Sequence, residues 1–75
     1  MSRQDLTPAE VDRRMAAAAQ AAQQGEFREA ARLYNELGKD IQARHGQFDA
    51  RALDAFEAVA RTIRKGAEAQ DQAAG

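Results

Sequence analysis

The sequence predicts an all-α fold of three antiparallel helices, because it is rich in alanine, spaces its apolar residues at helical intervals and marks its helix ends clearly. Alanine supplies 19 of the 33 hydrophobic residues, and it is the strongest helix former while burying little surface. Leu, Ile, Val and Phe together number only 11 of 75 residues. We therefore expect one small domain with a thin core, which association with a partner would stabilise.

The first predicted helix covers residues 8–24. Pro8 suits its first turn, where the missing N–H costs nothing. The start also has a capping box and a hydrophobic staple, formed by Thr7 with Glu10 and by Leu6 with Val11. Gly25 is predicted to end the helix as the C′ residue.

The second predicted helix covers residues 26–45 and has one apolar stripe, made of Phe27, Ala30, Ala31, Tyr34, Leu37 and Ile41. Gly38 lies inside it and costs about 1 kcal/mol relative to alanine. The sequence leaves open whether Gly38 breaks the helix. We expect continuity, because Ile41 keeps the phase of the stripe.

The third predicted helix covers residues 49–65, with Asp49 as N-cap. Its predicted core face consists of Leu53, Phe56, Val59, Ala60 and Ile63. Gly66 is predicted to stop the helix. The domain would then span residues 8–66, with an N-terminal tail and cap at 1–7 and a disordered tail at 67–75.

Composition narrows the classes of function. The net charge of −1 comes from 11 basic and 12 acidic residues that are interspersed, which disfavours nucleic acid as a partner. No signal peptide or membrane-spanning run occurs, so we expect a cytoplasmic protein that does not enter the membrane. Nine Arg against two Lys, with the alanine content, is typical of a GC-rich bacterial genome, and the initial Met favours a natural start.

Catalytic and metal-binding signals are weak. The absence of cysteine leaves no disulfide and, with one histidine, too few ligands for structural zinc. His45 has no Ser or carboxylate pair placed to make it a catalytic base, and is predicted to be a helix C-terminal residue. Each carboxylate has a nearby Arg or Lys, and no phosphate-binding glycine motif occurs. We expect no enzymatic activity, no cofactor and no metal.

The segment QGEFREAARLY resembles the tetratricopeptide repeat (TPR) family. In that family the second helix opens with a glycine, an aromatic residue and an alanine, followed by another aromatic residue. Gly25, Phe27, Ala30 and Tyr34 match this pattern. The interval from Gly25 to Gly66 exceeds the usual repeat of about 34 residues, and looks like the longer kinesin light chain type that is also common in actinobacterial regulators.

The resemblance covers residues 9–66, about one and a half repeats, with departures. The Asp-His-Pro turn of the longer type is replaced by Gln47-Phe48-Asp49, and Ala18 and Ala19 stand where a large and a small residue are usual. Three repeats are normally needed for a stable solenoid. An apolar edge is therefore expected to remain uncovered.

The resemblance implies a non-enzymatic adaptor that binds a peptide or helix in a TPR-like groove between the first and third helices. The residues implied as partner contacts are Met15, Ala19, Gln23, Phe56, Ala60 and Arg64. The structural alternative is a homo-oligomer that buries the uncovered edge in a homodimer. A weaker alternative is a small DNA-binding regulator that uses a basic strip of Arg51, Arg61, Arg64 and Lys65. We interpret the aromatic residues Phe27, Tyr34, Phe48 and Phe56 mainly as core.

Overall fold

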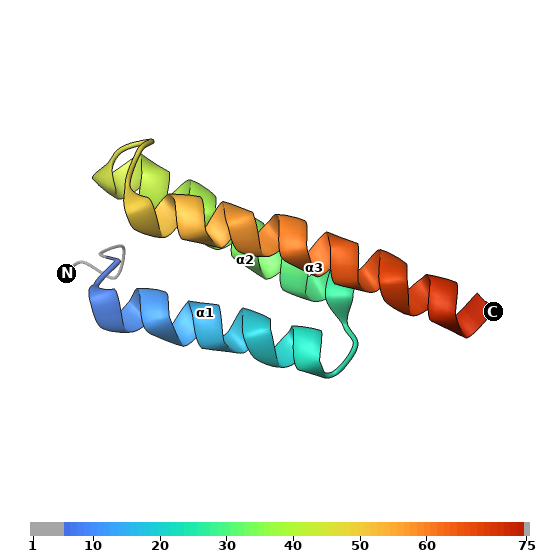
Figure 1. Ribbon diagram of the computed structural model, residues 1–75. Helices are drawn as coiled ribbons and strands as arrows, with labels where there is room; N and C mark the ends of the chain where they lie inside the picture. The colour runs from blue at the N-terminus through green and yellow to red at the C-terminus, as the bar shows by residue number, and fades with distance from the viewer. Residues whose placement is uncertain (1–5, 75) are drawn as a thin grey trace.

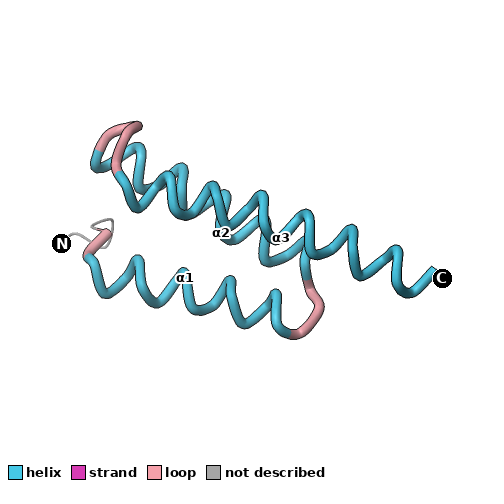
Figure 2. The backbone as a smooth tube through the Cα atoms, in the orientation of Figure 1, coloured by secondary structure: helices cyan, strands magenta, loops and turns pink. Residues whose placement is uncertain are grey.

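The computed structural model describes residues 6–74 as three α-helices, and no strand occurs in this range (Figures 1 and 2). They are α1 (Pro8–Gln23), α2 (Phe27–His45) and α3 (Ala50–Ala74). The two connecting turns lie at opposite ends, so successive helices run antiparallel, and α1 and α3 each pack against α2. The molecule is elongated, at 51 × 22 × 13 Å. The all-α, three-helix prediction is confirmed.

The start of α1 follows the predicted local signals. The Thr7 hydroxyl oxygen accepts a hydrogen bond from the Glu10 amide at 3.1 Å, as an N-cap does. Leu6 and Val11 are both buried in the same core cluster, as the staple requires. The helix therefore begins at the predicted residue.

The turn between α1 and α2 depends on Gly25. Its φ of 83° lies in the left-handed region that favours glycine. The Gly25 amide donates to the Ala22 carbonyl, and the Glu26 amide donates to the Ala21 carbonyl. This pair of bonds is a Schellman motif, which satisfies the last carbonyls of α1. Gly25 thus ends the helix as predicted.

Helix α2 runs through Gly38 without a break. A Cβ atom at this position would lie 2.7 Å from both Cε1 and Cζ of Phe56. The missing side chain therefore makes room for an aromatic ring of α3, which explains a glycine in a helix interior. The expectation of continuity is confirmed.

The core forms two clusters along the long axis, and both draw residues from α1, α2 and α3. The first consists of Leu6, Val11, Leu37, Ile41, Ala52 and Ala55, with Met15 and Phe56 packed against it. The second consists of Ala18, Tyr34 and Ala58, with Met15, Leu33 and Val59 packed against it. Since alanine occupies many of these positions, the helices approach closely and the core is thin.

The predicted end of α3 is wrong. The sequence predicted a stop after Lys65 and a disordered tail at 67–75, whereas α3 continues to Ala74. Gly66 has no positive φ and lies within the helix. Its Cβ would lie 3.0 Å from the Phe27 Cβ, so glycine here permits close packing rather than a turn. Alanine-rich sequence then carries the helix onward. Residue 75 and residues 1–5 of the predicted N-terminal tail lie outside the described residues.

The predicted core face of α3 is also wrong in part. The buried residues are instead Ala52, Ala55, Ala58 and Thr62. Of the predicted residues, Phe56 and Val59 are half-buried, Ala60 is exposed, and Leu53 and Ile63 are 46% and 60% exposed. The reason is the close approach of α3 to α2, where a Cβ at Gly38 or Gly66 would meet an aromatic residue, so small side chains of α3 face α2. Thr62 is accommodated because its hydroxyl donates to the Ala58 carbonyl at 2.7 Å.

Phe48 is a further exception among the aromatic residues predicted as core. Its side chain is 81% exposed, in the turn between α2 and α3. Tyr34 is buried, whereas Phe27 and Phe56 are half-buried at the α2–α3 contact. The described chain thus presents large apolar side chains on α3 and on the turn before it.

Candidate interaction surface

A row of apolar residues lies along one side of α3, beside its packed side. We call this the outer α3 face, and its members are the exposed Leu53, Ala60, Ile63 and Ala67 and the half-buried Phe56, whose ring also packs over Gly38 of α2. They recur at alternating intervals of three and four residues, which places them in one row on a helix. Since Leu53 and Ile63 are about half or more exposed, the row meets solvent over much of its length.

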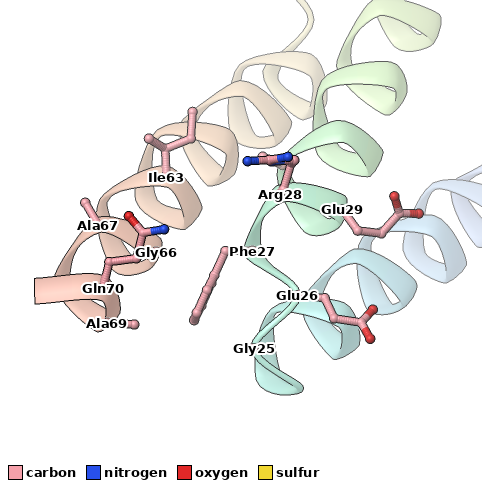
Figure 3. Close-up of a pocket in the computed structure, with 11 residues that line it drawn as sticks. Gly25, Glu26, Phe27, Arg28, Glu29, Ile63, Gly66, Ala67, Ala69 and Gln70 are labelled. Atoms are coloured by element: carbon pink, nitrogen blue, oxygen red, sulfur yellow. The ribbon is translucent and has the colours of Figure 1, made fainter. Parts of the chain in front are cut away.

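An open pocket of about 980 Å³ adjoins this face near the C-terminal end of α3 (Figure 3). It lies between α3 and the beginning of α2, with the Phe27 side chain between the two helices. The pocket shares Ile63 and Ala67 with the outer α3 face, and its other lining residues are Gly25, Glu26, Phe27, Arg28, Glu29, Ala31, Gly66, Ala69 and Gln70. The outer face therefore continues into a concave, largely apolar site.

The pocket exists because α3 is longer than α2. The C-terminal part of α3 projects past the turn between α1 and α2, as Figure 1 shows. Phe27, the first residue of α2, packs against Gly66, and the residues of α3 beyond that contact form one wall of the pocket. The extension that the sequence prediction missed thus builds this site.

The predicted partner contacts fall into two groups, one on α3 and one on α1. Phe56, Ala60 and Arg64 all lie on or beside the outer α3 face, with Ala60 and Arg64 exposed.

The three predicted contacts from α1 lie apart from that face. Met15 is half-buried and packs against both core clusters, Ala19 is half-buried, and Gln23 is exposed at the last residue of α1. The structure brings Met15 and Phe56 to the same cluster. The pocket that adjoins α3 has no lining residue from α1.

Sequence reasoning assigned Leu53 and Ile63 to the core and so missed them as surface residues. A signal was present, because α3 carries two neighbouring stripes of helical spacing. One stripe is made of small residues, Ala52, Ala55 and Ala58, and the other contains the large ones. Because a helix with one buried side needs only one apolar stripe, the second stripe of α3 was a signal for an exposed apolar surface.

Several charges on α2 are engaged within the chain. The Arg32 guanidinium donates to Glu29 at 2.6 Å and to Glu36 at 2.7 Å. The hydrogen bond from Arg32 lowers the pKa of Glu29, and the bonds to both carboxylates raise the pKa of Arg32. Between helices, Arg14 pairs with Asp40 at 2.9 Å and links α1 to α2.

The beginning of α3 is fixed by Asp49, as predicted. Its Oδ1 accepts from the Arg51 amide at 2.8 Å, and the Arg51 guanidinium donates to the same carboxylate. The side-chain hydrogen bond from Arg51, with the backbone bond, lowers the pKa of Asp49. Arg51 is therefore committed to the helix cap, which weakens the basic strip considered for DNA binding.

Two exposed charges flank the outer α3 face. Glu57 and Arg64 each follow a member of the row, Phe56 and Ile63 respectively, and lie on the same side of it. Within residues 6–74 neither forms an ion pair, so both remain open to a partner.

A smaller pocket of about 550 Å³ contains His45, at the other end of the molecule. His45 is the last residue of α2, as predicted, and its Nε2 lies 3.4 Å from the Leu6 carbonyl oxygen. The other lining residues are Leu6, Thr7, Pro8, Ala43 and Arg44, which include no carboxylate or thiol.

Two further classes of site are absent from residues 6–74. No group of three or more acidic or histidine side chains in this range could hold a metal ion. No helix of the range is both long and apolar enough to cross a bilayer.

Comparison with known proteins found no match to any family model, curated protein or solved structure. The resemblance to tetratricopeptide repeats therefore stays a prediction, carried by Gly25, Phe27, Ala30 and Tyr34.

Proposed function

We propose that this protein is a non-enzymatic protein–protein interaction module that binds an amphipathic helix on the outer α3 face. The observation that carries the proposal is the exposure of Leu53 and Ile63 on a helix whose other side is already packed. Exposed apolar rows of this kind commonly mark protein-binding surfaces. The adjoining pocket offers a concave site for one large apolar side chain of the partner.

The chemistry of the partner follows from the spacing of the face. A row that alternates intervals of three and four residues matches a second helix with the same spacing, which inserts its side chains between those of α3. Glu57 and Arg64 beside the row favour a helix that carries charges of both signs along its flank. The expected partner segment is thus an amphipathic helix with mixed charge.

This surface overlaps only partly with the predicted groove. Phe56, Ala60 and Arg64 belong to it, whereas binding through Met15, Ala19 and Gln23 of α1 stays a prediction.

The test uses the full chain with a photo-activated cross-linking residue at Leu53, in an extract of the source cells. We expect an adduct that maps to one amphipathic helix of one polypeptide. Binding of that purified polypeptide is then compared between Ile63→Asp and Ala17→Asp. Both positions are exposed, but Ala17 lies on α1 away from the face.

Loss of binding in Ile63→Asp alone supports the proposal, provided that circular dichroism shows both variants folded. Equal binding by both variants, or the absence of a mapped adduct, refutes it.

A further inference from the structure

The outer α3 face has the pattern of a coiled-coil seam. Leu53, Phe56, Ala60, Ile63 and Ala67 follow one another at intervals of three, four, three and four residues, which is the spacing of the two core positions of a heptad. The next residue in this series is Gln70, which also lines the pocket. The face is therefore suited to a helix of the same kind.

We infer that the helix bound on the outer α3 face is α3 of a second copy of this chain, in antiparallel orientation. This inference rests on the proposed function and names its partner. Side-chain size supports it first. In the antiparallel register centred between Arg61 and Thr62, Phe56 lies opposite Ala67 of the second copy.

The same register places Ile63 opposite Ala60 of the second copy, so Phe56 and Ile63 each meet an alanine. A parallel pair in register would instead stack Phe56 on Phe56 and Ala60 on Ala60, which alternates crowded and empty layers. Packing therefore favours the antiparallel arrangement.

Charge supports the same register independently. In an antiparallel helix pair, the residues that directly follow the second core position of each heptad face the equivalent residues of the other helix. Glu57 follows Phe56 and Arg64 follows Ile63. Glu57 therefore lies beside Arg64 of the second copy, between the Phe56–Ala67 pair and the Ala60–Ile63 pair. Two-fold symmetry forms this ion pair twice. In a parallel pair, the opposing flank consists of Ala52, Val59 and Gly66, which carry no charge.

The pocket gains an occupant in this arrangement. Leu53 of the second copy lies opposite Gln70, at the edge of the pocket that contains Phe27 and Ile63. The half-exposed leucine and the open apolar pocket thus cover each other, once on each side of the two-fold axis. Burial of both removes apolar surface that a single chain leaves in water.

The first measurement is the solution mass of the full chain by sedimentation equilibrium over a concentration series. We expect a monomer–dimer equilibrium at micromolar concentration. A chain that stays monomeric up to about 1 mM overturns the inference.

The second measurement reverses the flanking charges. Glu57→Arg and Arg64→Glu each turn both ion pairs into like-charge contacts, and each is expected to weaken the homodimer about tenfold. A mixture of the two variants restores both pairs across the seam, so it is expected to form the heterodimer preferentially.

The matched controls are Asp54→Arg and Arg61→Glu, which make the same charge changes at exposed positions farther from the row. They are expected to leave the dimer unchanged. A dimer that responds equally to all four variants, or to none, overturns the register.

The third measurement determines orientation. Since the chain has no native cysteine, Asp71→Cys accepts a single spin label. In the antiparallel register the two labels lie about 30 Å apart along the helix axis, because each residue of a helix adds about 1.5 Å. A parallel pair would bring them to about 10 Å. The shorter distance overturns the antiparallel assignment.

These outcomes separate the inference from the proposed function. A monomeric chain that still cross-links from Leu53 to an amphipathic helix of another protein overturns the second copy as partner and leaves the interaction surface in place. A monomeric chain without a mapped adduct refutes both.

Discussion

The contact between Gly38 and Phe56 leads to the most direct test of how α3 packs on α2. Gly38→Ala adds a methyl group to a helix interior, where alanine is favoured over glycine by about 1 kcal/mol. The new Cβ would lie 2.7 Å from two carbons of the Phe56 ring. Since carbon atoms pack best at about 3.5–4.0 Å, the ring must move by about 1 Å.

The cost of that movement decides the sign of the effect. Overpacking of this kind typically costs about 1–3 kcal/mol, which equals or exceeds the gain in helix propensity. We therefore expect Gly38→Ala to leave the free energy of unfolding unchanged or to lower it by up to about 2 kcal/mol. In a Phe56→Ala background the ring is absent, and the same change is expected to stabilise the protein by about 1 kcal/mol.

The assay is urea unfolding of the four proteins of this double-mutant cycle, followed by circular dichroism at one protein concentration. The expected coupling between the two sites is about 1–3 kcal/mol. If Gly38→Ala stabilises both backgrounds equally, the Phe56 ring does not lie over Gly38 and the packing of α3 described above is incorrect.

Three further changes test the helix ends and the core. Thr7→Ala removes the N-cap oxygen and is expected to lower the free energy of unfolding by about 1 kcal/mol, whereas Thr7→Gly costs only a few tenths; equal losses in urea unfolding would contradict the cap. Ala30→Leu overpacks a fully buried site and is expected to cost about 1–3 kcal/mol, and an unchanged urea midpoint would count against it. Because folding lowers the pKa of Asp49, its carboxylate stabilises the fold above its ordinary pKa, and this contribution is lost as pH falls through the lowered value. Asp49→Asn is therefore expected to lose less stability than the parent protein as the pH falls. If the free energy of unfolding falls equally steeply with pH in both proteins, that role is refuted.

The helix starts and the first turn could be predicted because their causes are local. Thr7 and Asp49 cap the helices that follow them through hydrogen bonds within three residues. Gly25 similarly forms its Schellman motif with neighbours in sequence. Signals of this range are present in the sequence before any tertiary contact forms.

The role of Gly66 could not be predicted in this way. A glycine after a long helical stripe most often ends the helix, and that rule gave a stop at Lys65. Here Gly66 instead faces Phe27, and the contact depends on how α3 lies across α2. Only the tertiary arrangement distinguishes a terminating glycine from one that permits close packing.

The candidate surface was identified in part. Ala60 and Arg64 were predicted as partner contacts and are exposed beside the apolar row. Leu53 and Ile63 were assigned to the core, because periodicity gives the spacing of a stripe without the distance at which a neighbouring helix packs. The size of the side chains at that distance decides which stripe is buried.

The orientation of α3 follows from its close approach to α2. If α3 turned about its axis to bury Leu53 and Ile63, branched side chains would replace alanines that are now fully buried, and the helices would have to separate. That separation would remove Phe27 from Gly66, where the missing side chain now lets the two helices meet. The single chain can therefore bury one stripe of α3 but not both, because close packing selects the small residues. Leu53 and Ile63 remain on the outside, where another helix that approaches from solvent can cover them without disturbing the core.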